Sequence, residues 1–264
     1  MNFTELVELE KSFEGIVFSE RDHSYFIDGV KSRSSVTQLI KQYVKPFESE
    51  KIAKIVAARD GMEVGDVLDK WNFAKELGCH RGTQIHLYIE NFLARKKAPL
   101  NSADIEAFVR LHPDYISVEK YYKDLAQYVA AFQTFYGWWK ERYVLIKSEL
   151  VVGDRKSGVC GCIDNLSYDL NKKELCLFDY KSNKEIKTKG KEKMLGPLSH
   201  LDNCELNTYS LQLCIYSLIL KRNTSLALNE LPKILWLSDK CYELITIKPL
   251  FEEAQLLLDL NVAD

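Results

Sequence analysis

The sequence predicts an α/β protein in which a central mixed sheet is flanked by helices and preceded by a helical elaboration. Two observations predict this fold class. An amphipathic helix expected over about 119–142 leads into a meander of three strands, and a helix over about 207–222 leads into a further strand at 233–238. This order of elements is typical of a sheet covered by helices. With 264 residues, of which 46% are hydrophobic, the chain is long enough to bury such a core.

We expect one domain over residues 1–264, with a hairpin and helices over 1–80 and the core over 81–248. The formal net charge of −2 gives no general attraction to polyanions, so a site for one must be local. No apolar run approaches the roughly 20 residues of a membrane span, and the acidic start lacks the layout of a signal peptide. The cysteines are odd in number and lie mostly in apolar segments, which favours reduced thiols in the cytoplasm.

The first elements are predicted from turn and capping residues. Short strands are expected over 16–33 around Asp28-Gly29, a dipeptide that is a strong hairpin signal between apolar runs. Ser35 and Gln38 then fit a capping box at the start of a short helix.

Two helices are expected next, over 50–78 and 83–96, the first with a break at Asp60-Gly61. The segment between them, 78–82, begins and ends with glycine, so it is predicted to be a turn. Residues 101–117 are polar and include a proline, and we expect a surface loop there.

The core strands are predicted from apolar runs between turn-like segments. A lysine-rich loop over 182–205 separates the meander from the helix that follows, and a C-terminal helix ends the chain. The expected strands cover 143–152, 158–169, 174–181, 233–238 and 243–247.

Asp179 and Lys181 end the third strand, which is otherwise apolar. At spacing i, i+2 both side chains share one face of the strand, and burying them requires a partner, a metal ion or a catalytic role. The same acid-x-Lys pattern occurs at 154–156 and 185–187. Those segments are polar, so we interpret their charges as solvated. Only the pair at the strand end suits a site for a metal ion and a phosphate.

Asp164 is predicted to lie opposite Asp179. A hairpin centred between Asn171 and Lys172 sets the two acids at directly paired positions, where Cβ atoms lie ~5 Å apart. Two carboxylates at that distance repel each other, and a divalent cation between them gives a hard oxygen site suited to Mg²⁺. Gly161 would let the chain bend or a ligand approach.

Two further candidates flank this pair. With a loop at 153–158, Glu149 is expected near Cys162, one diagonal step from Asp164. There it is a metal ligand, a group that orients water, or an exposed edge residue. His86 lies beside the apolar stripe of its helix, where an isolated histidine is more often half-buried than a ligand.

Gln212 and Tyr216 lie one turn apart on the helix over 207–222. They form either a packing pair or a pair that holds a phosphate or the lysine at 181. The segment 181–193 has a local charge of +4, which suits phosphate contacts as well as a solvated surface. Aromatic residues over 121–143 follow helical spacing, so we interpret them as core rather than as base-stacking groups.

The candidates fall into an ordered set of motifs: Gly82-x-x-x-His86, Glu149, Gly161-x-x-Asp164, Asp179-x-Lys181 and Gln212-x-x-x-Tyr216. This set resembles the PD-(D/E)XK nuclease superfamily, in its RecB-like and phage-type exonuclease branch. The resemblance spans about 80–220. Each motif is common by chance, whereas the whole set in this order and spacing is much rarer.

The resemblance implies a restriction-endonuclease-like core and a metal ion at its centre. Asp164 and Asp179 would hold a catalytic Mg²⁺, for which Mn²⁺ substitutes, with the backbone carbonyl of Tyr180 as a further ligand. His86 would be an additional ligand, and Glu149 would bind the ion or position the water. A divalent cation suits phosphodiester hydrolysis because it activates water and neutralises phosphate charge.

The resemblance also implies roles around the metal ion. Lys181 would activate the attacking water or stabilise charge on the phosphorus centre, while Gln212 and Tyr216 would support the site and the strand being cut. Lysines of the loop would contact the substrate: Lys184, Lys187 and Lys189. Iron–sulfur members of this branch use one upstream cysteine and a close C-terminal cluster. The cysteines at 204, 214 and 241 are far apart, so no iron–sulfur cluster is expected.

The function implied is hydrolysis of DNA by an exonuclease that acts on DNA ends or single strands, in recombination, repair or phage DNA processing. Its place would be the cytoplasm of a bacterium or of a phage-infected host. DNA is the expected partner, and a homo-oligomer or a recombination partner protein stays open. One alternative is a structure- or site-specific endonuclease on the same core. The other is a nucleic-acid-binding protein that keeps the nuclease fold without catalysis.

Overall fold

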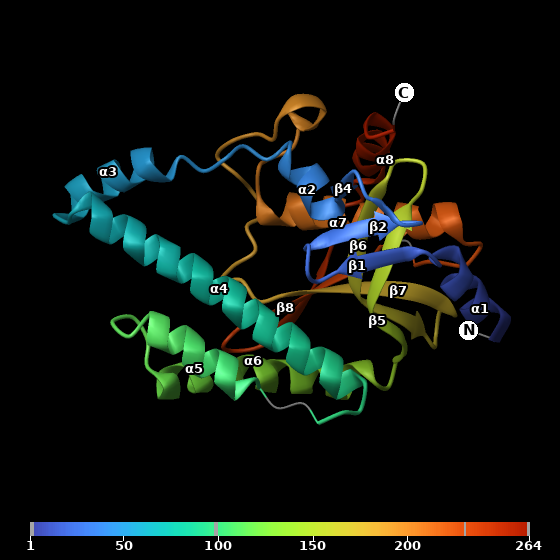
Figure 1. Cartoon of the computed structure of the whole chain (residues 1–264), viewed down its shortest axis with the longest axis horizontal. Helices are drawn as coiled ribbons and strands as arrows, with labels where there is room; N and C mark the ends of the chain where they lie inside the picture. The colour runs from blue at the N-terminus through green and yellow to red at the C-terminus, as the bar shows by residue number, and fades with distance from the viewer. Residues whose placement is uncertain (1–2, 98–99, 230, 263–264) are drawn as a thin grey trace.

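The computed structural model describes residues 3–97, 100–229 and 231–262. A mixed six-stranded sheet lies at the centre of the fold (Figure 1). Its strands are β4 (Ser34–Ser35), β5 (Tyr143–Asp154), β6 (Val159–Asp169), β7 (Glu174–Lys181), β8 (Lys233–Leu237) and β9 (Tyr242–Thr246). β5, β6 and β7 form the predicted antiparallel meander. β8 lies parallel to β7, β9 is antiparallel to β8, and the short β4 runs parallel to the start of β6.

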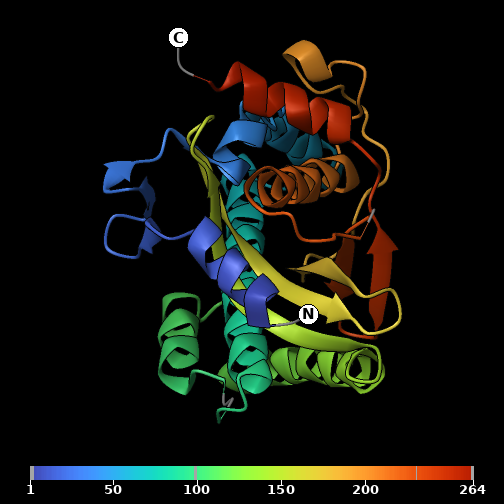
Figure 2. The ribbon, with the colours of Figure 1, turned by 90° about the vertical axis from the view of Figure 1, so that its right-hand side faces the viewer.

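Helices cover both faces of this sheet, which gives three layers (Figure 2). One face carries α2 (Val36–Lys41), α7 (Glu205–Asn223) and α8 (Phe251–Leu260), and the other carries α4 (Val64–Leu93), α5 (Ser102–Leu111) and α6 (Val118–Trp139). Successive residues of β7 pack into opposite cores, Leu177 on the α7 side and Phe178 on the α6 side. A strand buried on both faces requires an apolar run, and β7 is such a run until Asp179.

The N-terminal elaboration begins with α1 (Phe3–Ser12) and a small sheet of β1 (Ile16–Ser19), β2 (Ser24–Ile27) and β3 (Val30–Lys31). Asp28 and Gly29 have φ values of 50° and 82°. Positive φ at both central residues is characteristic of the type I′ hairpin turn, and Ile27 pairs with Val30 across it, so the hairpin prediction is confirmed. The predicted capping box of Ser35 and Gln38 is present at the start of α2.

α3 (Ser49–Asp60) ends at Gly61, whose φ of 64° forms a left-handed C-cap, as the predicted break requires. The predicted turn at 78–82 is wrong, because α4 runs through it as one helix of 30 residues. Each glycine lowers helix stability by ~1 kcal/mol relative to alanine, but contacts to α6 offset this. His80 Nδ1 lies 2.6 Å from the Tyr121 hydroxyl, and Arg81 Nη1 lies 3.3 Å from Asp124.

The predicted loop at 101–117 is wrong in its first part, where α5 forms. The Asn101 side chain caps α5 by accepting a hydrogen bond from the Asp104 backbone at 3.3 Å. Ile105, Phe108 and Val109 are buried, and their i, i+3, i+4 spacing is that of an amphipathic helix. The polar residues between them concealed this pattern.

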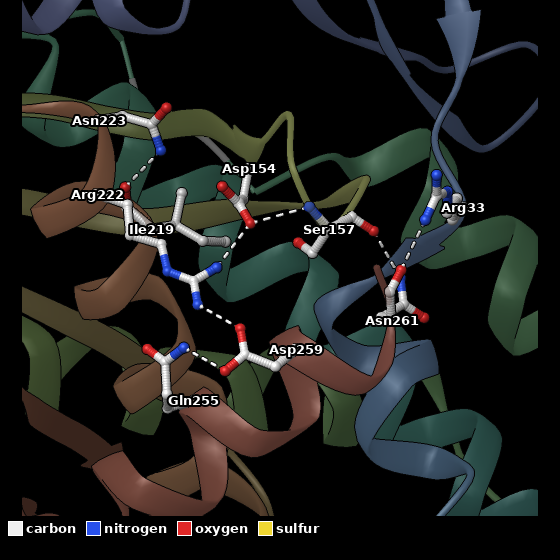
Figure 3. A network of polar contacts seen from close by, with 9 residues as sticks. All are labelled: Arg33, Asp154, Ser157, Ile219, Arg222, Asn223, Gln255, Asp259 and Asn261. Atoms are coloured by element: carbon white, nitrogen blue, oxygen red, sulfur yellow. Dashed lines mark hydrogen bonds and ion pairs between the residues drawn. The ribbon is translucent and has the colours of Figure 1, made fainter. Parts of the chain in front are cut away.

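A polar network joins the ends of α7 and α8 to the β5–β6 turn (Figure 3). Asp154 is buried and accepts hydrogen bonds from Arg222 Nη1 at 2.8 Å and from the Ser157 backbone at 3.1 Å. Arg222 also reaches Asp259 at 3.1 Å. The interpretation of Asp154 as solvated charge is therefore wrong. The other segment with the acid-x-Lys pattern, 185–187, contains an exposed ion pair between Glu185 and Lys187, as expected.

Within the described residues, no helix is both long enough and apolar enough to span a bilayer. The cysteines there are free thiols, and the core contains Cys160, Cys176, Cys204 and Cys214.

Candidate active site

The acids of the meander meet where the β6–β7 ladder ends. Asn165 pairs with Phe178, so the next residues outward, Asp164 and Asp179, face each other as the hairpin register predicted. Beyond this pair, the side chain of Asp164 takes the place of a backbone acceptor from β6. The Tyr180 backbone N–H donates to Asp164 Oδ2 at 2.7 Å. This bond orients the Asp164 carboxylate at the mouth of the site.

Glu149 lies opposite Asp164, not one diagonal step away. Ser148 pairs with Asn165 and Leu150 with Ile163, which sets Glu149 across from Asp164. The register differs because β5 continues to Asp154, and the turn that follows is closed by Gly158 at a φ of 68°.

The backbone of Glu149 has a φ of 48°. A non-glycine residue in this left-handed region is strained by ~1–3 kcal/mol, and such strain is concentrated at functional sites. The side chain accepts a hydrogen bond from Cys162 Sγ at 3.2 Å, which keeps the carboxylate within the site.

His86 completes a group that could hold a metal ion. It comes from α4, its Nε2 lies 3.1 Å from the Tyr180 carbonyl oxygen, and its Nδ1 lies 3.9 Å from Asp164 Oδ2. His86, Glu149 and Asp164 each offer a ligand atom within 4.8 Å of the others. An imidazole, carboxylates and a backbone carbonyl together form a nitrogen and oxygen donor set of the kind that binds divalent cations.

Asp179 and Lys181 form a buried ion pair beside this group. Only 2% of Asp179 is exposed, and its Oδ2 lies 2.5 Å from Lys181 Nζ. A hydrogen bond between the two groups favours the charged form of each. Lys181 Nζ also lies 4.6 Å from the centre of the Tyr209 ring.

Burial and crowding of like charges shift the titration of these groups. Burial raises the pKa of Asp179 to about 6, with attraction to Lys181 opposing the rise and repulsion from Asp164 adding to it. Burial and then repulsion from Asp164 raise the pKa of Glu149 to about 7. Desolvation alone would lower the pKa of Lys181, but attraction to Asp179 and Asp164 outweighs it and the pKa is raised. A divalent cation would offset the excess of negative charge.

Gln212 and Tyr216 both lie against the site from α7. Gln212 Nε2 donates to Asp179 Oδ1 at 3.4 Å. Tyr216 is buried, which raises the pKa of its hydroxyl despite a hydrogen bond with Gln212. A Cβ at Gly161 would lie 2.6 Å from the Tyr216 ring. The absence of a Cβ at Gly161 thus allows the close approach of this ring.

The loop lysines do not reach the acids, although the loop itself is anchored. Lys184, Lys187 and Lys189 are exposed, and Lys187 pairs with Glu185 at 3.3 Å. The Lys187 carbonyl accepts a hydrogen bond from the Leu206 backbone at 3.1 Å, which fixes this part of the loop near the start of α7. These lysines are therefore exposed charges on an anchored loop, and no ion pair among the described residues joins them to the acids of the site.

Sequence reasoning missed the contribution of the N-terminal hairpin. A pocket of about 390 Å³ lies between the hairpin and α2, and it shares Gly161 and Tyr216 with the site. Its lining includes the basic side chains of Lys31 and Arg33. Tyr25, also in the lining, has a pKa raised by burial and by the nearby thiols and acids of the site. No sequence signal joined these residues to motifs more than 100 positions away.

Tyr209 was missed as well, although a signal existed. It lies three residues before Gln212, so both share one face of α7.

No family model matches this sequence, and neither does any curated protein. One solved structure that resembles it is a "Putative exonuclease" from Eubacterium rectale, with a TM-score of 0.39 and 12% sequence identity. The match covers 70% of this chain and 64% of that chain, so it spans less than two thirds of the other protein. At this level of similarity we infer nothing about the present chain from it.

Proposed function

We propose that this protein is a metal-dependent deoxyribonuclease with a PD-(D/E)XK core, using Mg²⁺ to hydrolyse DNA phosphodiester bonds. The observation that carries the proposal is the group at the end of β7. Asp164, Asp179 and Glu149 converge there with one lysine and one histidine, supplied by three strands and a helix. Such a concentration of negative charge is unfavourable without a cation.

The ligands in this proposal are Asp164, Asp179, His86 and the Tyr180 carbonyl, with Glu149 as a further ligand or as the group that orients water. A bound Mg²⁺ stabilises charge on the phosphate and lowers the pKa of a bound water. The nitrogen and oxygen donor set of His86, Glu149 and Asp164 fits such an ion, and Asp179 lies beside this group in contact with Lys181.

The protein's own groups divide the remaining work. The raised pKa of Lys181 keeps its ammonium charged at neutral pH, so it acts as a cation and hydrogen-bond donor toward the phosphate rather than as a base. Burial raises the pKa of Glu149 to about 7 in the metal-free protein, and in this proposal its carboxylate binds the ion or accepts a proton from water. Gln212 holds Asp179 in place through its hydrogen bond.

The substrate assignment is supported by the cations around the site. Lys31 and Arg33 line the adjoining pocket, and in this proposal the exposed lysines of the loop that follows Lys181 would contact a phosphate backbone. Exonucleolytic action on ends or single strands rests on the resemblance of the motifs. We further propose that 1–264 acts as one domain, in the cytoplasm of a bacterium or of a phage-infected host.

Cleavage assays test this proposal. Single- and double-stranded DNA labelled at the 5′ or the 3′ end should lose its label with Mg²⁺ or Mn²⁺ and stay intact with EDTA, and a covalently closed circle should persist. Cutting of the circle would support the endonuclease alternative instead. Lys181→Ala should lower kcat by about 10³-fold or more, because it removes a charge that stabilises the transition state. Binding of DNA without cleavage under all these conditions would leave the non-catalytic alternative.

A further inference from the structure

The chain that leaves Lys181 is held by side chains from distant parts of the fold. The β7–β8 ladder ends where Lys181 pairs with Trp236, so the carbonyls of Ser182 and Asn183 lie beyond it. Arg81 Nη2 donates to the Ser182 carbonyl at 3.0 Å, and Trp236 Nε1 donates to the Asn183 carbonyl at 2.8 Å. Buried carbonyls without a ladder partner require such donors.

Arg81 is an unusual choice for a purely structural contact. Its side chain is 13% exposed, its guanidinium lies 4.6 Å from the centre of the Tyr128 ring, and its Nη1 lies 3.3 Å from Asp124. Its Nε is buried with no hydrogen-bond partner in the described part of the chain. Burying a cation costs several kcal/mol unless it is fully paired. An apolar side chain would join α4 to α6 without that cost, but it could not hold the Ser182 carbonyl.

The two carbonyl contacts bear directly on the position of the lysine. Tyr180 packs in the core on the α6 side, so Lys181, its neighbour in the strand, points to the α7 side, where it meets Asp179 and Tyr209. A long flexible side chain keeps one position only if its backbone is fixed. Arg81 holds that backbone from the α6 side, and Trp236 holds it from the neighbouring strand β8, where it pairs with Lys181.

We infer that Arg81 and Trp236 are positioning residues that hold Lys181 against Asp179 through the carbonyls of Ser182 and Asn183. This inference rests on the nuclease function proposed above. The rival explanation is that Arg81 is a structural link between α4 and α6, with no influence on the lysine.

Arg81→Lys and Arg142→Lys form a matched pair of variants. Arg142 also donates to a backbone carbonyl, that of Trp138 at 2.9 Å, and its guanidinium lies 4.7 Å from the centre of the Trp138 ring. It makes these contacts at the end of α6. Lysine lacks the planar fork of arginine, so it cannot hold Asp124 and the Ser182 carbonyl together.

The measurement is kcat and KM on labelled single-stranded DNA with saturating Mg²⁺, alongside the melting temperature of each variant. Arg81→Lys should lower kcat by roughly 10–100-fold, since small misplacements of a catalytic group have effects of that size. KM should change by about threefold at most, because no substrate contact is removed. Arg142→Lys should lower the melting temperature about as much as Arg81→Lys does. Its kcat should nevertheless stay within about twofold of wild type.

Trp236→Phe keeps an aromatic side chain but removes the Nε1 donor together with the pyrrole ring. It tests the inference even if Arg81→Lys fails to fold, and its melting temperature measures the packing that is lost. It should lower kcat by about 3–10-fold, the size expected for one neutral hydrogen bond. The double variant should lose less than the product of the two effects, because both residues hold the same segment.

Wild-type kcat in Arg81→Lys, or in Trp236→Phe, would overturn the inference, as would an equal loss in Arg142→Lys. Wild-type protein that cleaves no DNA substrate with Mg²⁺ contradicts the proposed function instead, so the two failures are distinct.

Discussion

Replacing Glu149 by glutamine should stabilise the metal-free protein and abolish cleavage. The pKa of Glu149 rises from an ordinary 4.5 to about 7 on folding, because the carboxylate is buried next to Asp164. Between these two pH values the folded protein binds more protons than the unfolded chain, so its stability falls as pH rises. Above pH 7 the full penalty is present.

The size of this penalty follows from the pKa shift. At 1.36 kcal/mol for each pH unit, ionised Glu149 destabilises the metal-free protein by about 3 kcal/mol at pH 8. Glutamine is neutral, nearly equal in shape, and still able to accept the hydrogen bond from Cys162. The variant should therefore melt roughly 6–12 °C higher than wild type at pH 8 in EDTA, at 2–4 °C for each kcal/mol in a protein of this size. The difference should vanish near pH 4.

Thermal melts from pH 4 to 8 in EDTA, with cleavage assays in Mg²⁺, measure both effects. The control is Glu185→Gln, which removes an exposed carboxylate paired with Lys187. Its melting temperature should change by about 4 °C at most, since exposed ion pairs contribute ~0–1 kcal/mol. A Glu149→Gln variant that melts below wild type at pH 8, or with a difference independent of pH, would refute the reasoning. So would full nuclease activity in that variant.

Two further predictions follow from the site geometry. Metal affinity, measured by calorimetry with Mn²⁺, should rise steeply between pH 6 and 8. Asp179, with a pKa of about 6, and Glu149, with a pKa of about 7, must lose protons before the ion binds. An affinity that does not change with pH contradicts this prediction. Gly161→Ala should lower the free energy of unfolding by about 1–3 kcal/mol in urea titrations, because its Cβ would lie 2.6 Å from the buried Tyr216 ring. The control is Gly137→Ala in α6, where an added Cβ would have nothing within 4 Å. This change should leave the free energy of unfolding unchanged or raise it by up to ~1 kcal/mol. An equal decrease in the free energy of unfolding at both positions would contradict a specific clash at Gly161.

The sequence predicted those parts of the fold whose signals are local. The meander, its register at Asp164 and Asp179, the hairpin at Asp28-Gly29 and the end of α3 at Gly61 all depend on turn residues with defined backbone geometry. Apolar runs of β7 and β8 fixed the buried strands. For these elements, nearby residues contain the needed information.

Errors arose where distant contacts outweigh local preference. Gly78 and Gly82 weaken a helix, but His80 and Arg81 between them bind α6 and keep α4 continuous. Asp154 belongs to a turn in sequence, yet Arg222 reaches it from α7 and it becomes buried. No window of the sequence contains both members of such a pair, so a pattern cannot reveal the contact.

The misplacement of Glu149 strengthens the argument for a metal ion. In the register predicted from the sequence, only Asp164 and Asp179 face each other, and Glu149 lies one diagonal step from Asp164. The argument for a cation then depends on two carboxylates. The observed register sets Glu149 of β5 directly opposite Asp164 of β6, while Asp179 faces Asp164 from β7. One carboxylate thus lies between two others across adjacent strands, and the charge of Lys181 opposes theirs. Burial, with repulsion between the carboxylates added, raises the pKa values of Glu149 and Asp179 in the metal-free protein, so the proposed function requires binding of a divalent ion and release of protons to occur together.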